Sequence, residues 1–131
     1  MWTFTNLLAL GLFLFGTTFL WMTPAMAGTT PPPTGTAWTL TNVLSFAAVI
    51  GFTLAAWAVY KQYSWWDTAA LVSGIVGLVA VVPFTVGQSQ LDVGFGDPGV
   101  QINLWLHIVG SAAVTAIVLL PAAHDWVTRR L

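Results

Sequence analysis

Charged side chains are so scarce in this sequence that their number decides where the chain can fold. The 131 residues include three Lys or Arg and four Asp, with no Glu and no Cys, so 5% of the chain is charged, whereas a typical soluble domain has about 25%. A soluble protein of this length could not cover its surface with so few charges. Soluble enzymes, nucleic-acid-binding proteins and disordered chains are therefore excluded, and the absence of cysteine excludes disulfide frameworks and Cys-ligated zinc. A multispanning membrane protein remains.

Four long apolar stretches give the architecture. A transmembrane helix needs about 20 mostly apolar residues to cross about 30 Å of hydrocarbon. The stretches that qualify are 3–23, 39–60, 66–87 and 101–121. They are uniformly apolar and do not alternate, which indicates helices and not membrane strands. The sequence therefore predicts an all-α, integral membrane, antiparallel four-helix bundle that forms a single domain, residues 1–131, with no soluble domain.

The first stretch has one feature of a signal peptide. Ala25-Met26-Ala27 follows the apolar run and is typical of a signal-peptidase site. However, residues 1–6 contain no Lys or Arg, and the apolar run is long enough to span a membrane. We expect it to be retained as the first span.

The three basic residues predict the orientation. Lys61, Arg129 and Arg130 all fall on the side that carries both termini. Cytoplasmic segments are enriched in Lys and Arg, so this side is expected to be cytoplasmic. We therefore expect a multi-pass protein of the plasma membrane, with both termini in the cytoplasm and loops 24–37 and 88–100 outside. Lys61 and Asp67 are close enough in sequence to pair across the intervening turn.

The eight tryptophans lie near the ends of the predicted spans. Indole rings favour the membrane interface, where the ring is half in water and its N–H finds a partner. This anchoring role explains every one of them better than a cofactor cage does. The predicted interfacial anchors are Trp2, Trp21, Trp38, Trp57, Trp65, Trp66, Trp105 and Trp126.

Small residues repeat at helical spacing within two spans. Gly51 and Ala55 lie in the second predicted span, and Gly74 and Gly77 lie in the third. Helices in lipid associate through close backbone approach, which small residues permit. We expect these four positions to form helix-packing surfaces.

The fourth predicted span carries a polar stripe. Asn103, His107, Ser111 and Thr115 are spaced by four residues, so they share one helix face. A polar face is costly against lipid, so it should point into the bundle or towards a partner. His107 is the only ionisable side chain well inside a span.

Two further polar residues lie at a depth similar to that of His107. Asn42 opens the second span and Gln88 closes the third. An outward-opening pocket lined by Asn42, Gln88, Asn103 and His107 is therefore one hypothesis, and a purely structural hydrogen bond from His107 is the alternative. His124 is about 25 Å further along a helix, so the two histidines could not ligate one haem iron within a single chain.

The central part of the chain resembles an uncharacterised family of small four-span membrane proteins common in actinobacteria. The resemblance covers about residues 40–121 and rests on Trp57, Trp65-Trp66, Pro83 and Leu106-His107. It implies that the four-helix unit with His107 is a recurring design, and the family has no assigned activity to transfer. This chain differs in its uncharged amino terminus and its proline-rich first loop.

No nucleophile–base pair, carboxylate dyad or metal-ligand set can be assembled from the sequence, so we do not expect an enzyme. The favoured function is a non-enzymatic accessory, assembly or scaffold subunit, self-associating or packed against a larger membrane complex. One alternative is a small transporter, channel or lipophilic-ligand binder that uses the pocket around His107. A haem or quinone anchor is the second alternative. Otherwise we expect no cofactor, metal or nucleic acid, and the bilayer is the expected environment.

Overall fold

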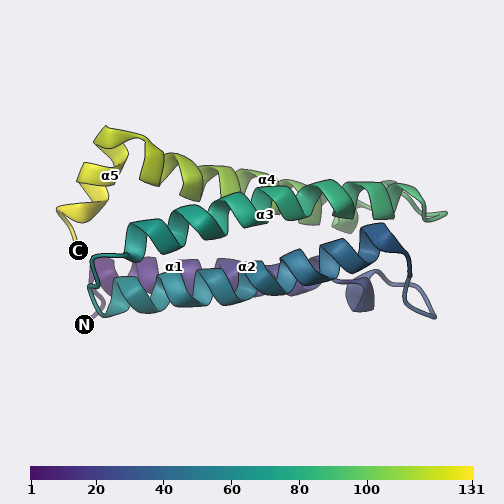
Figure 1. Ribbon diagram of the computed structural model, residues 1–131, viewed down its shortest axis with the longest axis horizontal. Coiled ribbons are helices and arrows are strands. Elements are labelled where there is room, and N and C mark those ends of the chain that lie inside the picture. Colours follow the sequence, from purple (N-terminus) through teal and green to yellow (C-terminus); the bar gives the residue numbers. More distant parts are fainter.

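The computed structural model describes residues 1–131 as a chain of helices joined by short connections (Figure 1). The long helices run alternately up and down, so both termini lie at the same end of the bundle as the turn between α2 and α3. We call this end, which includes Lys61, Arg129 and Arg130, the basic end, and the opposite end the loop end. The elements in chain order are α1 (Phe4–Thr18), the 3-10 helices η1 (Phe19–Met22) and η2 (Pro24–Met26), α2 (Thr36–Tyr60), α3 (Trp66–Ser89), α4 (Pro98–Leu119) and α5 (Pro121–Thr128).

Four of these segments are long and apolar enough to cross a membrane, and they pack against one another. α1 reaches this length together with η1, as Phe4–Met22. The sequence-predicted span ends differ from the observed ones by at most three residues. The prediction of an all-α membrane bundle of four spans is therefore confirmed.

Local sequence explains where α1 and α4 begin. The hydroxyl of Thr3 accepts a hydrogen bond from the Asn6 N–H at 3.2 Å and so caps α1. The Asp97 carboxylate accepts one from the Gly99 N–H at 2.7 Å and caps α4, whose first residue is Pro98. Both are favoured choices, because the first N–H groups of a helix have no partner within the helix and proline has no N–H to satisfy.

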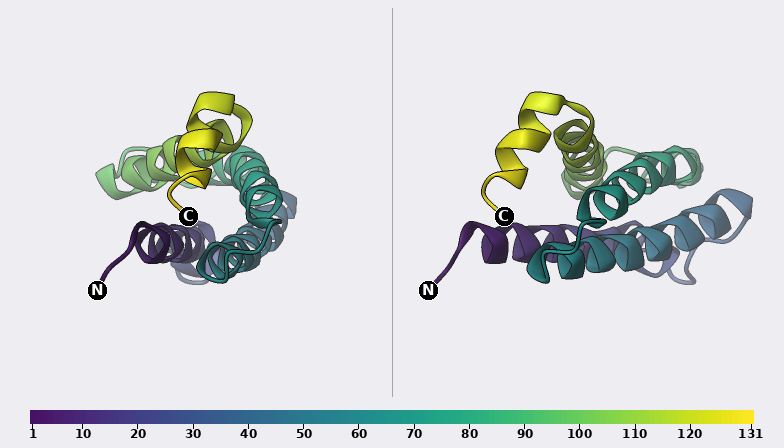
Figure 2. Two further views of the ribbon diagram at one scale, coloured as in Figure 1. Left: turned by 90° about the vertical axis from the view of Figure 1, so that its left-hand side faces the viewer. Right: turned by 60° about the vertical axis from the view of Figure 1, so that its left-hand side comes forward.

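The helices follow one another round the bundle in chain order. α1 packs on α2, α2 on α3 and α3 on α4, and the view along the bundle shows this arc with α5 across its end (Figure 2). Contacts of His107 with Thr18 and of Gly110 with Phe15 bring α4 back to α1. The bundle is thus closed by specific residues on its first and last spans.

Residues 121–128 form a fifth helix, which the apolar pattern of the sequence does not predict. α4 stops because Leu120 adopts an extended conformation, φ −85° and ψ 114°, ahead of Pro121, as residues before proline tend to do. The chain then folds back over the basic end, where Val127 is buried and the ring of Trp126 meets the ring of Phe4 edge-on at 5.5 Å. α5 therefore covers the basic end of the bundle beside α1.

The centre of the bundle is aromatic. Phe15, Phe19 and Phe52 have ring centres 5.0–5.7 Å apart, two pairs edge-on and the Phe19–Phe52 pair stacked. These rings fit because glycines face them: a Cβ on Gly16 would lie 2.5 Å from Cβ of Phe52, and one on Gly110 would strike the Phe15 ring. Glycine at these positions lets α1 approach both α2 and α4 closely.

Candidate functional site

His107 is fully buried on α4 and makes two hydrogen-bonding contacts. Nδ1 lies 2.6 Å from the carbonyl oxygen of Asn103, one turn earlier, and Nε2 lies 3.0 Å from Oγ1 of Thr18 on α1. Because a carbonyl oxygen only accepts, a neutral imidazole donates from Nδ1 to Asn103 and accepts at Nε2 from the Thr18 hydroxyl. The imidazole therefore links the last span to the first.

The Thr18 hydroxyl has a second acceptor. Its Oγ1 also lies 2.6 Å from the carbonyl oxygen of Phe15, in the preceding turn of α1. One hydroxyl proton is thus shared between that carbonyl and Nε2 of His107. Every polar atom of the His107–Thr18 pair is occupied by a partner within the chain.

Aromatic rings enclose the imidazole. The ring of Phe19 meets it edge-on with centres 4.4 Å apart, and the ring of Phe15 lies 6.0 Å away. These contacts keep the pair in apolar surroundings, where a hydrogen bond has no water to compete with it. This geometry suits a fixed hydrogen-bonded contact between α4 and α1.

The other members of the stripe face η1 of the first span or α3. Nδ2 of Asn103 donates to the carbonyl oxygen of Trp21 at 3.1 Å, beyond the end of α1. Ser111 is fully buried and its Oγ has no hydrogen-bond partner; it fills the space that Gly77 of α3 leaves open. Thr115 donates to the Ser111 carbonyl oxygen at 2.8 Å. The stripe thus packs against two different helices.

The four predicted packing residues lie between helices. A Cβ on Gly51 would come within 2.5 Å of Oγ of Ser73, and a Cβ on Gly74 would come within 2.5 Å of Oγ1 of Thr115. Gly77 faces Ser111 and Phe19, and Ala55 is fully buried. In the three glycine cases a polar side chain of the next helix occupies the space of the missing Cβ.

The structure does not bring the four residues of the hypothesised polar pocket together. Gln88 is buried, but its Nε2 donates to the carbonyl oxygen of Gly94 at 2.7 Å and holds the α3–α4 loop. Asn42 is half-buried on α2. A cavity of about 370 Å³ at the loop end includes Asn103, with Asp97 and Trp21, but none of the other three. Residues at a similar depth in the membrane can point in different directions round their helix axes. For this reason the four side chains do not line one pocket.

Two of the eight tryptophans predicted as interfacial anchors are buried against other parts of the chain. Trp38 is 2% exposed and lies against Gly87 and Phe84, and Trp66 is 8% exposed and stacks on the ring of His124. Both therefore make packing contacts within the chain. The remaining tryptophans, 43–69% exposed, are Trp2, Trp21, Trp57, Trp65, Trp105 and Trp126.

Charged groups at the basic end pair differently from the expected Lys61–Asp67 contact. Nε2 of His124 lies 3.1 Å from Oδ2 of Asp67, joining α5 to the first turn of α3. The Lys61 ammonium instead lies over aromatic rings, 5.0 Å from the centre of Trp57 and 5.6 Å from that of Tyr60. Asp67 reaches His124 because α5, absent from the prediction, folds back over this end.

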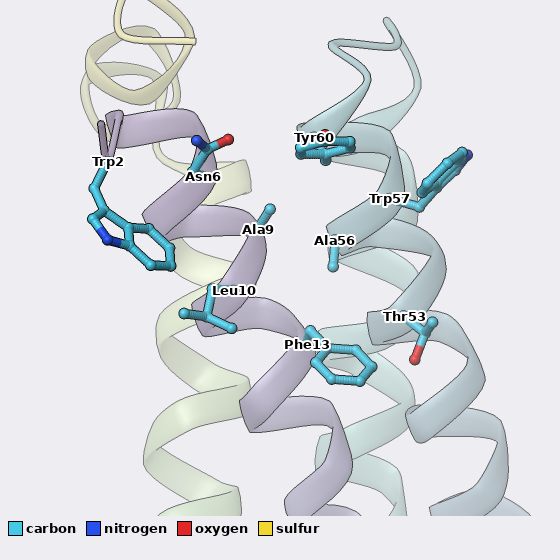
Figure 3. Close-up of a pocket in the computed structure, with 9 residues that line it drawn as sticks. All are labelled: Trp2, Asn6, Ala9, Leu10, Phe13, Thr53, Ala56, Trp57 and Tyr60. Atoms are coloured by element: carbon cyan, nitrogen blue, oxygen red, sulfur yellow. The ribbon is translucent and has the colours of Figure 1, made fainter.

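A lateral groove of about 450 Å³ opens between α1 and α2 at the basic end (Figure 3). The sequence did not indicate this groove, because Trp2 and Trp57 were interpreted as separate anchors. Small side chains, Ala9 and Ala56, face each other across its floor. We call it the α1–α2 groove; its lining residues are Trp2, Asn6, Ala9, Leu10, Phe13, Thr53, Ala56, Trp57 and Tyr60.

Comparison with models of protein families, with curated proteins and with solved structures gave no match. The resemblance to the actinobacterial four-span family stays a prediction.

Proposed function

We propose that this membrane protein is a non-enzymatic accessory, assembly or scaffold subunit that associates with a second copy of itself or with a larger membrane complex. The proposal rests on the burial and hydrogen-bonding contacts of His107, the one ionisable side chain deep in a span. Its ring nitrogens contact Thr18 and the Asn103 carbonyl, and it is fully buried. Such a group supports the bundle and has no free atom to offer a substrate.

The outer face of α4 is the favoured association surface. Only 11% of the α4 span is buried within the chain, against 39% for the spans of α2 and α3. Its exposed residues include Trp105, Val109 and Ala112, spaced as the positions of a helix–helix seam are. Ala112 and Ala113 leave room for close approach of a partner helix, which is how helices associate in lipid.

Substitution of Ala112 by phenylalanine tests this proposal. Purification from native membranes in mild detergent, followed by native mass spectrometry, should find the wild-type chain with a second copy or a partner protein. Ala112→Phe should lose that partner, because a bulky ring prevents close helix approach. Ala47→Phe is the matched control, since Ala47 is exposed on α2. The proposal would be contradicted by a wild-type monomer with no co-purifying protein, or by equal association of the two variants.

A further inference from the structure

The α1–α2 groove is confined to one leaflet of the membrane. It runs from Asn6 to Phe13 on α1 and from Tyr60 to Thr53 on α2, which is about 10 Å at 1.5 Å per residue. One leaflet of hydrocarbon is about 15 Å deep. In Figure 3 the groove has Tyr60 at its outer end and the ring of Phe13 at its deep end. A partner helix that spans the membrane would contact a surface as long as the whole membrane is thick. An acyl chain lies within one leaflet, so the length of the groove matches an acyl chain.

The polarity of the groove changes along its length. Its floor and deep end are formed by alanines, Leu10, Phe13 and Thr53, whose hydroxyl is taken up by the Val49 carbonyl oxygen of its own helix. Asn6 and Tyr60 lie near the mouth. The Lys61 ammonium is held over the rings of Trp57 and Tyr60, both of which line the groove. None of the lining residues is acidic. A largely apolar groove with a cation held against two of its lining rings complements an amphiphile with a negatively charged head.

We propose that the α1–α2 groove binds an acyl chain of one anionic phospholipid, whose phosphate headgroup pairs with Lys61. Aromatic side chains at headgroup depth and a lysine that reaches the interface are the groups expected to hold such a lipid. The inference concerns a surface separate from the outer face of α4, so it does not depend on the proposed subunit function.

Native mass spectrometry with phosphatidylglycerol and phosphatidylcholine of the same acyl chains tests the inference. The purified wild-type protein should hold one phosphatidylglycerol about fivefold more tightly than phosphatidylcholine, the effect of one cation near an anionic headgroup. Lys61→Gln should abolish this preference and leave phosphatidylcholine binding unchanged. Lys61 is exposed, so this variant keeps the bundle intact.

A second pair of variants tests whether the acyl chain binds in the α1–α2 groove. Thr53→Trp places a large ring in the groove and should weaken binding of both lipids. Thr39→Trp is the matched control: both threonines are exposed on α2 and donate to the carbonyl oxygen four residues earlier, but Thr39 lies at the loop end. Thermal unfolding of each variant checks that the fold is kept, and Lys61→Gln decides the outcome if Thr53→Trp does not fold.

Equal affinity of the wild type for the two lipids would overturn the inference, as would unchanged binding to a folded Thr53→Trp. It would also be overturned if Thr53→Trp displaced a co-purifying protein, and not a lipid, while Thr39→Trp retained it.

Discussion

His107 and Thr18 are 89 residues apart in the sequence, yet Nε2 of one lies 3.0 Å from Oγ1 of the other. The pair connects α4 to α1, the contact that closes the bundle between its last and first spans. The ring of Phe15 packs against Gly110 one turn further along the same contact. The ionisable group within the membrane is thus placed where the bundle needs a contact between its ends.

Removal of the Thr18 hydroxyl should weaken this closure. Thr18→Val keeps the shape of the side chain but leaves Nε2 of His107 without a partner. Hydrogen bonds between membrane helices contribute about 0.6 kcal/mol on average and up to about 1.7 kcal/mol. We expect a loss of about 0.5–1.5 kcal/mol in the free energy of unfolding, measured by steric trapping in mild detergent.

Thr17 provides the control for that substitution. Its hydroxyl donates to the Leu14 carbonyl oxygen at 2.7 Å, within α1. Thr17→Val should stay within about 0.5 kcal/mol of the wild type. Equal destabilisation by the two substitutions would mean that Thr18 acts within α1 alone.

Addition of one methyl group at Gly77 should separate α3 from α4. A Cβ there would strike Oγ of Ser111 and lie 2.7 Å from Cζ of Phe19, so Gly77→Ala should destabilise the bundle by about 1–3 kcal/mol. Gly11→Ala is the matched control, because nothing lies within 4 Å of its added Cβ. The control should be neutral or slightly stabilising, since alanine favours a helix over glycine. Similar unfolding curves for the two variants would disprove the predicted close approach.

The docking of α5 should depend on Val127. This side chain is 4% exposed and lines a small cavity with residues of α1 and α4, including Leu8 and Val118. Val127→Ala removes two methyl groups, about 1.5 kcal/mol of burial, and should raise amide hydrogen exchange in α5 about tenfold. Thr128→Ala, at the exposed neighbouring position, should leave exchange unchanged. Unaltered exchange in both variants would show that α5 is held by other contacts.

The proposed orientation can be tested by labelling, since the chain contains no cysteine. Ser64→Cys places a thiol in the turn at the basic end, and Asp92→Cys places one in the α3–α4 loop. A membrane-impermeant maleimide on intact cells should label Asp92→Cys only, and permeabilisation should expose Ser64→Cys. Labelling of Ser64→Cys in intact cells would reverse the predicted topology.

The spans could be predicted from sequence because an apolar run of about 20 residues is sufficient evidence for a membrane helix. α5 could not be predicted in the same way, because its eight residues are too few for a span and it forms by packing Val127 against the bundle. In retrospect Pro121 was a usable signal, since proline favours the first position of a helix.

The site was predicted less completely than the fold. Spacing by four correctly grouped His107 and Ser111 on one face, and both are fully buried. The position of a residue along its span could not show that the Gln88 amide donates to the Gly94 carbonyl oxygen, or that the Trp38 ring packs against Gly87. Those outcomes depend on the rotation of each helix about its own axis, which is fixed only by the packing of all four spans.

A double-mutant cycle between Thr18 and His107 tests the central claim, that the buried histidine closes the bundle. The unfolding free energy would be measured for the wild type, Thr18→Val, His107→Phe and the double variant in lipid-free mild detergent. If the two side chains interact as described, the cycle gives a coupling free energy of about 0.5–1.5 kcal/mol. A coupling free energy of zero, with additive effects of the two substitutions, would contradict the account.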